Sequence, residues 1–204
     1  EKISLGILSE DNPIQITDGE AGCALSHRKL WELTANNEVG SLILEDDIIT
    51  HKKLIEFINI NYHEIMRFDI IFFSVNTDSI LESISPEGVH TLKLFANRYP
   101  SQDQIKETLN KTNLNEVRID KLLKSFGSSA YFISPKGADI LKKYVFPFKG
   151  TAIKIPLKDK PFYPTGIDSE VLRYLENLNA IVCNPLLAYT PNQNSTTTLK
   201  RYKL

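Results

Sequence analysis

Apolar and polar positions along the chain predict an early helix followed by a buried strand. Between residues 19 and 37, apolar and small side chains recur at spacings of three and four, the period of a helix with one packed face. Thr17-Asp18-Gly19-Glu20 precedes them with the spacing of a capping box, in which Thr and Glu satisfy free amides at a helix start. Asn36 and Asn37 indicate its end. Residues 41–44, Ser-Leu-Ile-Leu, then predict a buried strand.

The rest of the chain continues to alternate between strand and helix patterns. Ser134 followed by Pro135 is a strand-to-helix turn with a capping Ser and a Pro at the first helical position. Residues 76–104 are rich in Ser, Pro, Gly and Asn and predict a functional loop or flap within one domain. We expect further strands at 3–8, 69–75, 90–95, 128–133 and 180–183, and helices at 52–67, 105–124 (which residues 110–115 could divide), 135–144 and 168–178. This alternation predicts an α/β fold with a mixed sheet flanked by helices.

Composition narrows the class of protein. With 204 residues, 42% of them hydrophobic, the chain can bury one sizeable core, so we expect a single domain over residues 1–204. The 24 Lys and Arg are balanced by 25 Asp and Glu, which disfavours general nucleic-acid binding. Cys23 and Cys183 form no CxxC pair, which favours a reducing cytoplasm over a disulfide framework. Apolar runs fall short of the roughly 20 residues that cross a bilayer.

Three acidic residues, Glu45-Asp46-Asp47, directly follow the strand predicted at 41–44. Ligands of α/β sheets bind at the carboxyl ends of strands. Adjacent carboxylates raise one another's pKa unless a cation is present, and oxygen ligands suit Mg²⁺ or Mn²⁺, which also grip a substrate diphosphate. The sequence therefore indicates a metal site here. A solvated acidic turn that caps the following helix is the alternative.

Other candidate residues have both a functional and a structural interpretation. His27 follows Cys23 by four residues, a spacing compatible with shared metal ligation. Two ligands do not complete a zinc site, however, and a buried Cys beside a hydrogen-bonded His is the commoner arrangement. Gly22 is interpreted as a close-packing point. Gly127-Ser128-Ser129 fits an ordinary turn or a backbone-lined ligand cradle. Asp168 fits a helix N-cap or a general base acting on a hydroxyl.

Three segments in order, 19–27, 42–47 and 130–138, resemble glycosyltransferase family 25. That family includes bacterial lipooligosaccharide galactosyltransferases and relatives of the collagen galactosyltransferases, and the resemblance covers about residues 17–190. It implies a GT-A-like, Rossmann-like fold. It also implies metal-assisted, inverting transfer of a hexose, with galactose favoured, from a UDP-sugar to a saccharide hydroxyl.

The resemblance also assigns roles to individual positions. By position, the resemblance implies that Glu45, Asp46 and Asp47 form the motif that holds the metal and diphosphate, with Asp47 the first choice as direct ligand. It places Glu20 and His27 in the donor pocket. Asp168 matches an Ile-Asp pair late in the family sequences, and Gln193 matches a Gln near their C-terminal end. We expect Asp168 to act as the catalytic base and Ser128 and Gln193 to bind substrate. The family's N-terminal nucleotide-binding segment has no match at residues 1–16, so we expect part of that segment to be lacking. The family's late Ser-Asp pair is replaced by residues 194–196, Asn-Ser-Thr.

The sequence thus predicts a cytoplasmic, metal-dependent hexosyltransferase of bacterial lipooligosaccharide assembly, using Mn²⁺ or Mg²⁺. The basic tail 200–203 is expected to add weak attraction to the inner face of the bacterial inner membrane. Two alternatives remain open. One is a non-catalytic saccharide-binding or scaffold protein, and the other is a metal-dependent phosphodiester hydrolase, which needs further carboxylates and His residues at the site.

Overall fold

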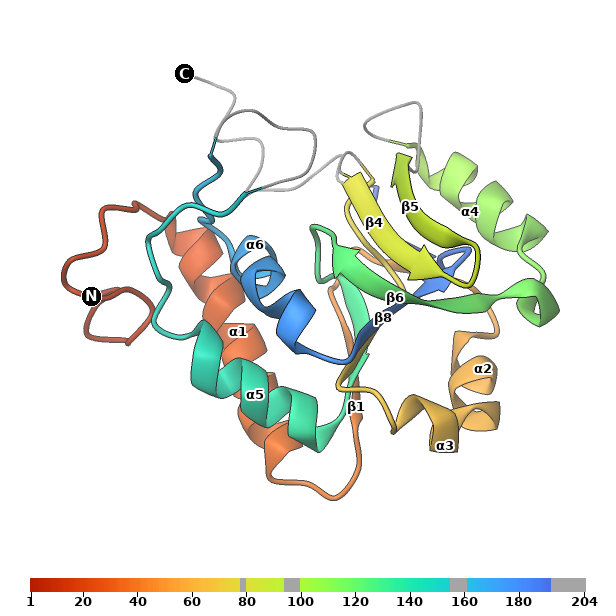
Figure 1. The fold of residues 1–204 in the computed structure, drawn as a ribbon, viewed down its shortest axis with the longest axis horizontal. Coiled ribbons are helices and arrows are strands. Elements are labelled where there is room, and N and C mark those ends of the chain that lie inside the picture. Colours follow the sequence, from red (N-terminus) through yellow and green to blue (C-terminus); the bar gives the residue numbers. More distant parts are fainter. Residues whose placement is uncertain (78–79, 94–99, 155–160, 192–204) are drawn as a thin grey trace.

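A seven-stranded mixed sheet forms the centre of the molecule (Figure 1). The structure is a computed structural model that describes residues 1–77, 80–93, 100–154 and 161–191. The strand order is β1-β7-β3-β8-β6-β4-β5, with bounds β1 (Ser41–Leu44), β3 (Ile70–Phe72), β4 (Ile80–Ser85), β5 (Gly88–Lys93), β6 (Arg118–Lys124), β7 (Ala130–Ile133) and β8 (Ala180–Asn184). β1, β3 and β8 run in one direction, and β7 and β6 run against them. The predicted α/β fold with a mixed sheet is confirmed.

Helices cover both faces of this sheet. On one face α1 (Asp18–Ala35) packs against α5 (Pro135–Val145), and both contact α6 (Ile167–Val171). On the other face lie α2 (Leu54–Ile60) and α3 (Tyr62–Ile65). Ile70 and Phe72 belong to the apolar cluster of the first face and Ile71 and Phe73 to that of the second. This period of two explains why the strand has a continuous apolar sequence: both of its faces are buried.

Two helix starts are built as the sequence predicts. Thr17 Oγ1 accepts a hydrogen bond from the Glu20 amide at 3.2 Å, and Glu20 Oε2 accepts one from the Thr17 amide at 2.7 Å, which completes the capping box of α1. At α5, Ser134 Oγ accepts from the Gly137 amide at 3.1 Å, and Pro135 is the first helical residue.

The helix predicted at 105–124 is wrong in its second half. α4 (Gln102–Lys111) ends before a short 3₁₀ turn, η1 (Leu114–Glu116), and residues 118–124 form β6 between β8 and β4. Asn113 starts that turn, since its side-chain Oδ1 accepts from the Asn115 amide at 3.1 Å. Pairing with two neighbouring strands therefore overrides the amphipathic helical pattern of the local sequence.

The N-terminal strand predicted at 3–8 is also wrong. These residues form turns, and Leu8 makes an isolated bridge to Phe148. Gly6 has φ of +67°, a left-handed conformation that does not occur within a regular strand.

The expected loop at 76–104 contains a β-hairpin. β4 and β5 pair antiparallel and extend the sheet at one edge, and Gly88, at φ +128°, is the first residue of β5 after the turn. The helix predicted at 52–67 is divided at Asn61, whose side-chain amide donates to the Phe57 carbonyl at 2.8 Å. The helix predicted at 168–178 begins as α6 and continues as the 3₁₀ helix η2 (Leu172–Asn177). A separate small sheet is formed by β2 (Ile49–Thr50) and β9 (Ala188–Tyr189).

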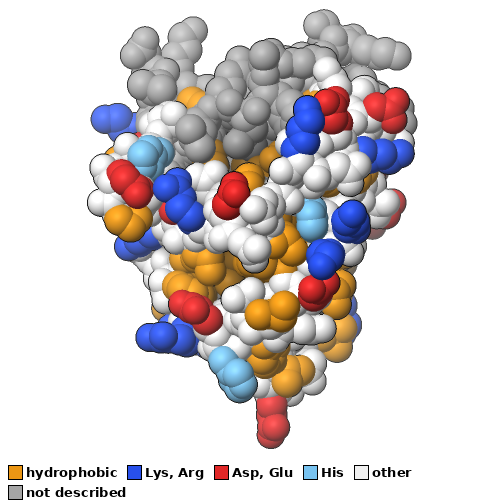
Figure 2. All heavy atoms as spheres, turned by 90° about the vertical axis from the view of Figure 1, so that its right-hand side faces the viewer, with side chains coloured by type: hydrophobic (Ala, Val, Ile, Leu, Met, Phe, Trp, Pro, Cys, Tyr) orange, Lys and Arg blue, Asp and Glu red, His pale blue; other side chains and the backbone are white. Residues whose placement is uncertain are grey.

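The outer surface on the side of α2 and α4 mixes charges of both signs around apolar side chains (Figure 2). Within the described ranges, no helix combines the length and apolar character that a membrane span requires. The basic tail 200–203 lies outside the described residues.

Candidate functional site

The predicted site residues that the structure describes lie at one edge of the sheet, where β1 and β3 finish. β1 and β3 end there, and the acidic turn Glu45–Asp47 and Asn76 follow them, while Ser128 precedes the antiparallel β7 at the same edge. The Glu45 amide donates to the Ser129 carbonyl at 2.8 Å, which joins the acidic turn to the β7 entry. The N-terminal half of α1 and the start of α6 bring their polar residues to this edge.

Cys23, His27 and Glu45 converge at this edge. One ligand atom from each, the Cys23 sulfur, a His27 ring nitrogen and a Glu45 carboxylate oxygen, lie within 4.8 Å of one another. His27 Nε2 is 3.6 Å from Glu45 Oε1. His27 is buried, with 3% of its surface exposed, whereas the Glu45 side chain is 37% exposed. The cluster therefore has a protein side, formed by α1, and a solvent side, formed by Glu45.

The buried Tyr131 hydroxyl holds His27 in place. It lies 2.7 Å from His27 Nδ1 and accepts a hydrogen bond from Trp31 Nε1 at 2.8 Å. The His27 and Tyr131 rings also stack, with centroids 5.7 Å apart. Burial raises the pKa of Tyr131 far above its ordinary value, so the hydroxyl stays neutral. These contacts fix the imidazole with Nε2 toward Glu45.

Negative charge accumulates around Cys23. Burial raises the pKa of its thiol to about 12, and the charges of Glu45, Asp168 and Glu20 add to that shift. The same interactions show that Glu20, Glu45 and Asp168, predicted separately from the sequence, are brought together near Cys23. The Glu20 carboxylate also serves the capping box through its Oε2 atom.

Asp46 and Asp47 lie in the exposed turn after β1. Partial desolvation raises the pKa of Asp47, the Thr190 side chain opposes that rise, and the carboxylates of Glu45 and Asp46 add to it. Glu45 turns toward α1, and among the described residues the group of three potential ligands is Cys23, His27 and Glu45 rather than the three consecutive acids. The exposed Asp46 and Asp47 therefore lie next to the Glu45 carboxylate, whose charge acts on Asp47.

Asp168 lies half-buried in the first turn of α6. Asn76 Nδ2 donates to its Oδ2 at 3.5 Å. Asn76 in turn packs on Gly127, where φ is +95° and an added Cβ would lie 2.5 Å from Asn76 Oδ1. The N-cap interpretation of Asp168 is wrong, because Gly166 is the N-cap and its amide donates to Ser169 Oγ at 3.2 Å. Asp168 instead lies within the first turn of α6, two residues after its N-cap.

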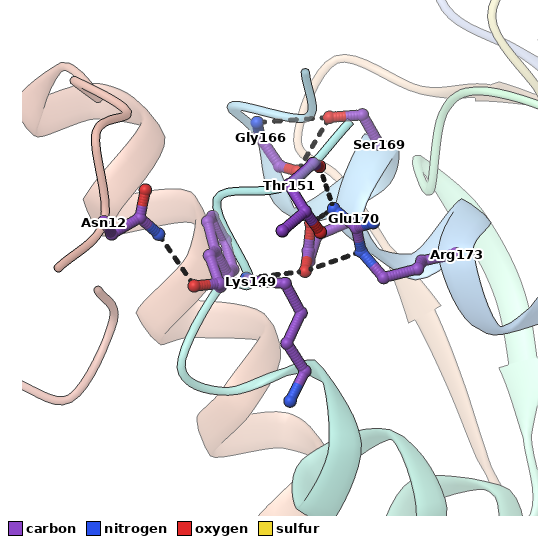
Figure 3. A network of polar contacts seen from close by, with 8 residues as sticks. Asn12, Lys149, Thr151, Gly166, Ser169, Glu170 and Arg173 are labelled. Atoms are coloured by element: carbon purple, nitrogen blue, oxygen red, sulfur yellow. Dashed lines mark hydrogen bonds and ion pairs between the residues drawn. The ribbon is translucent and has the colours of Figure 1, made fainter. Parts of the chain in front are cut away.

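A buried network of polar contacts joins α6 and η2 to the loop that follows α5 (Figure 3). Glu170 is fully buried and accepts hydrogen bonds from Arg173 Nε at 3.1 Å and from the Lys149 amide at 2.9 Å. Arg173 Nη2 also donates to the Thr151 carbonyl at 2.7 Å, and Asn12 donates to the Phe148 carbonyl at 2.7 Å. Sequence analysis missed this network, although Glu and Arg three residues apart on a helix are a visible signal.

The remaining predictions have different outcomes. The Ser128 hydroxyl is buried and has no hydrogen-bond partner among the described residues. Gln193 lies outside the described residues. Gly22 is not a close-packing point, because an added Cβ would meet no atom within 4 Å, so the helix face beside Cys23 is open.

Comparison with known proteins identifies a matching family and a similar protein. The model of a family described as Glycosyltransferase family 25 (LPS biosynthesis protein) matches residues 6–155, which include the α1 cluster, the acidic turn and β7. A Haemophilus influenzae protein named "Putative glycosyltransferase" is 30% identical over 132 residues. The matched region is 64% of this chain and 38% of that protein, so the chain spans well under half the length of this curated relative.

Proposed function

This chain belongs to glycosyltransferase family 25, and we propose from that membership that it transfers a hexose from a UDP-sugar to a saccharide hydroxyl. Galactose is the favoured hexose, and a lipooligosaccharide-type glycan is the proposed acceptor. The observation that carries the proposal is the acidic turn Glu45–Asp47, which follows β1 at the sheet edge where α/β folds bind ligands and lies within the segment matched to the family.

The acidic turn fits a divalent metal ion. Asp46 and Asp47 supply exposed carboxylate oxygens, the ligand type that Mn²⁺ and Mg²⁺ prefer. Partial desolvation raises the pKa of Asp47, the charges of Glu45 and Asp46 add to that rise, and a cation would relieve this repulsion. Asp46 and Asp47 would hold the ion, with Glu45 beside them. When bound, the ion offsets the charge that develops on the departing diphosphate.

Asp168 is the residue we propose as general base. It is half-buried at the same sheet edge, near Cys23, and Asn76 holds one of its oxygens. Its carboxylate takes the proton of the attacking saccharide hydroxyl as the new glycosidic bond forms and the bond to the diphosphate breaks. The transfer proceeds with inversion and needs no covalent intermediate. Glu20, His27 and Ser128 border the proposed donor pocket.

The proposed reaction is cytoplasmic. Both cysteines, Cys23 and Cys183, are free thiols, as a reducing compartment favours. The proposed partners are a UDP-sugar and the growing saccharide.

A donor screen tests this function. The full-length protein is incubated with UDP-galactose, UDP-glucose, UDP-N-acetylglucosamine or UDP-N-acetylgalactosamine, with Mn²⁺ or with a chelator, and UDP release is measured with and without a saccharide acceptor. We expect Mn²⁺-dependent release that is fastest with UDP-galactose and rises with acceptor. Failure to bind or turn over any donor would instead favour the non-catalytic scaffold.

A further inference from the structure

Cys23 and His27 lie one helical turn apart on α1 and face Glu45 at the end of β1. The three side chains offer a sulfur, an imidazole nitrogen and a carboxylate oxygen, and one such atom from each lies within 4.8 Å of the others. Thiolate and imidazole ligands together select zinc-like ions over Mg²⁺ or Mn²⁺. This donor set differs in kind from the all-carboxylate turn of Asp46 and Asp47.

The distance between His27 and Glu45 fits a shared ion better than a direct hydrogen bond. His27 Nε2 and Glu45 Oε1 are 3.6 Å apart, beyond the usual hydrogen-bond range of about 2.7–3.2 Å. Nitrogen and oxygen ligands about 2.0–2.1 Å from one tetrahedral zinc ion lie roughly 3.3–3.4 Å from each other. A small adjustment of the partly exposed Glu45 side chain is sufficient to bring both atoms onto an ion.

The surroundings of His27 match those of a metal-binding imidazole. Such a residue donates its other ring N–H to a fixed partner, which orients the ring and raises its basicity. The Tyr131 hydroxyl lies 2.7 Å from Nδ1, and its oxygen can accept from both Trp31 Nε1 and His27 when Nδ1 carries the proton. In that tautomer the Nε2 lone pair points toward Glu45.

The charges near the cluster also favour a cation. Glu45, Asp168 and Glu20 all act on Cys23, and a bound cation would offset these charges and stabilise the thiolate. Cys23 and Glu45 are both partly exposed, so an ion has access from solvent.

We propose that Cys23, His27 and Glu45 form a zinc-type site with three protein ligands and one further coordination position. Three protein ligands with an open position are typical of zinc sites that bind water or substrate. The proposal does not depend on the transferase activity, because it concerns binding by the free protein.

Cobalt substitution tests the site directly. The metal-free full-length protein is titrated with Co²⁺, whose absorption reports a thiolate ligand through a sulfur-to-cobalt charge-transfer band, and Zn²⁺ affinity is measured by competition with a chromophoric chelator. We expect one equivalent of Co²⁺ and a charge-transfer band that Zn²⁺ displaces. Cys23→Ser abolishes the band, and both Cys23→Ser and Glu45→Gln weaken Zn²⁺ binding by about 100-fold or more, since even residues that only support a ligand change affinity by about 10–100-fold.

Matched variants separate this site from the acidic turn. Asp46→Asn and Asp47→Asn retain the band and the Zn²⁺ affinity, as does Cys183→Ala, which removes the other thiol. Glu45→Gln changes a partly exposed side chain, and circular dichroism verifies that it folds. A wild-type protein without stoichiometric binding or a charge-transfer band overturns the proposal, and so does a Zn²⁺ affinity that follows Asp46 and Asp47 instead of Cys23.

Discussion

The Tyr131 hydroxyl connects two side chains of α1 to the central sheet. It is buried, lies 2.7 Å from His27 Nδ1 and accepts from Trp31 Nε1 at 2.8 Å. A buried donor that loses its partner keeps the full cost of its desolvation. This hydroxyl therefore contributes to stability and to the orientation of His27 at the same time.

Tyr131→Phe should lower the free energy of unfolding by about 1–3 kcal/mol, because Trp31 Nε1 and His27 Nδ1 lose their shared partner. Urea unfolding measures the change. Tyr144→Phe is the matched control, since Tyr144 is 48% exposed, and it should leave the urea midpoint unchanged. Equal midpoints for the two variants would show that the Tyr131 hydrogen bonds contribute nothing to stability.

Asp47 should destabilise the fold in its charged form. Its pKa in the folded protein is raised above the ordinary value of 3.8, so the folded state binds more protons than the unfolded state between these two pKa values. Stability contributed at this position therefore falls as pH rises through that window. Asp47→Asn should raise the unfolding free energy at neutral pH, by less than about 1 kcal/mol because solvent screens an exposed charge.

The gain from Asp47→Asn should vanish below pH 3.8, where the wild-type carboxyl is also neutral. Urea unfolding at neutral pH and below pH 3.8 measures this gain, with Asp103→Asn, which changes an exposed carboxylate of α4, as the control. A variant that is less stable than wild type at neutral pH would contradict the charge conflict proposed for the acidic turn.

At the scale of elements, α1 both carries site residues and begins with a strong cap. Thr17→Ala removes the hydroxyl that accepts from the Glu20 amide, and loss of such a cap costs about 0.5–2 kcal/mol. Because Glu20, Cys23 and His27 lie in the first three turns of α1, we expect both the unfolding free energy and the rate of sugar transfer to fall.

Ser101→Ala is the matched control for Thr17→Ala. Ser101 completes a capping box of the same type on α4, with its Oγ 3.2 Å from the Gln104 amide. It should lower stability by a similar amount and leave the transfer rate unchanged. Equal effects of the two variants on the rate would mean that the start of α1 has no special link to the site.

Elements with strong local signals are the ones that the sequence predicts well. The cap at Thr17, the Ser134-Pro135 turn and the apolar runs of β1 and β8 each depend on neighbouring residues, and the structure confirms them. β6 depends instead on pairing with β8 and β4, which are distant in the chain. Its local pattern gave no strand signal strong enough to outweigh a helix.

The candidate site, too, could be predicted from the sequence only in part. The acidic turn could be found because a buried strand runs directly into it, and His27 because it lies one turn from Cys23. Their convergence with Glu45 could not, since the direction of the Glu45 side chain is set by tertiary packing. Whether Asp46 and Asp47 bind a metal stays a prediction.

At the scale of the whole molecule, the Glu170–Arg173 pair ties α6 to the loop that follows α5. Arg173→Met leaves the fully buried Glu170 charge without its partner, and breaking a buried pair in this way costs about 3–5 kcal/mol. Lys142→Met removes one member of a more exposed pair with Asp139 and should cost less than about 1 kcal/mol.

Urea unfolding compares these two variants, and the double variant Glu170→Leu with Arg173→Met should recover part of the loss, because it buries no unpaired charge. A loss for Arg173→Met no larger than that for Lys142→Met would show that the network of Figure 3 does not stabilise the fold.

The most direct test of the account is the rate of Mn²⁺-dependent UDP-sugar transfer by the full-length double variant Asp46→Asn with Asp47→Asn. Glu107→Gln, an exposed carboxylate on α4, is the control and should retain the wild-type rate. We predict that the double variant loses about 100–1,000-fold in rate, the range seen when one group that stabilises transition-state charge is removed. Transfer that stays at the wild-type rate and remains Mn²⁺-dependent would contradict the assignment of the acidic turn.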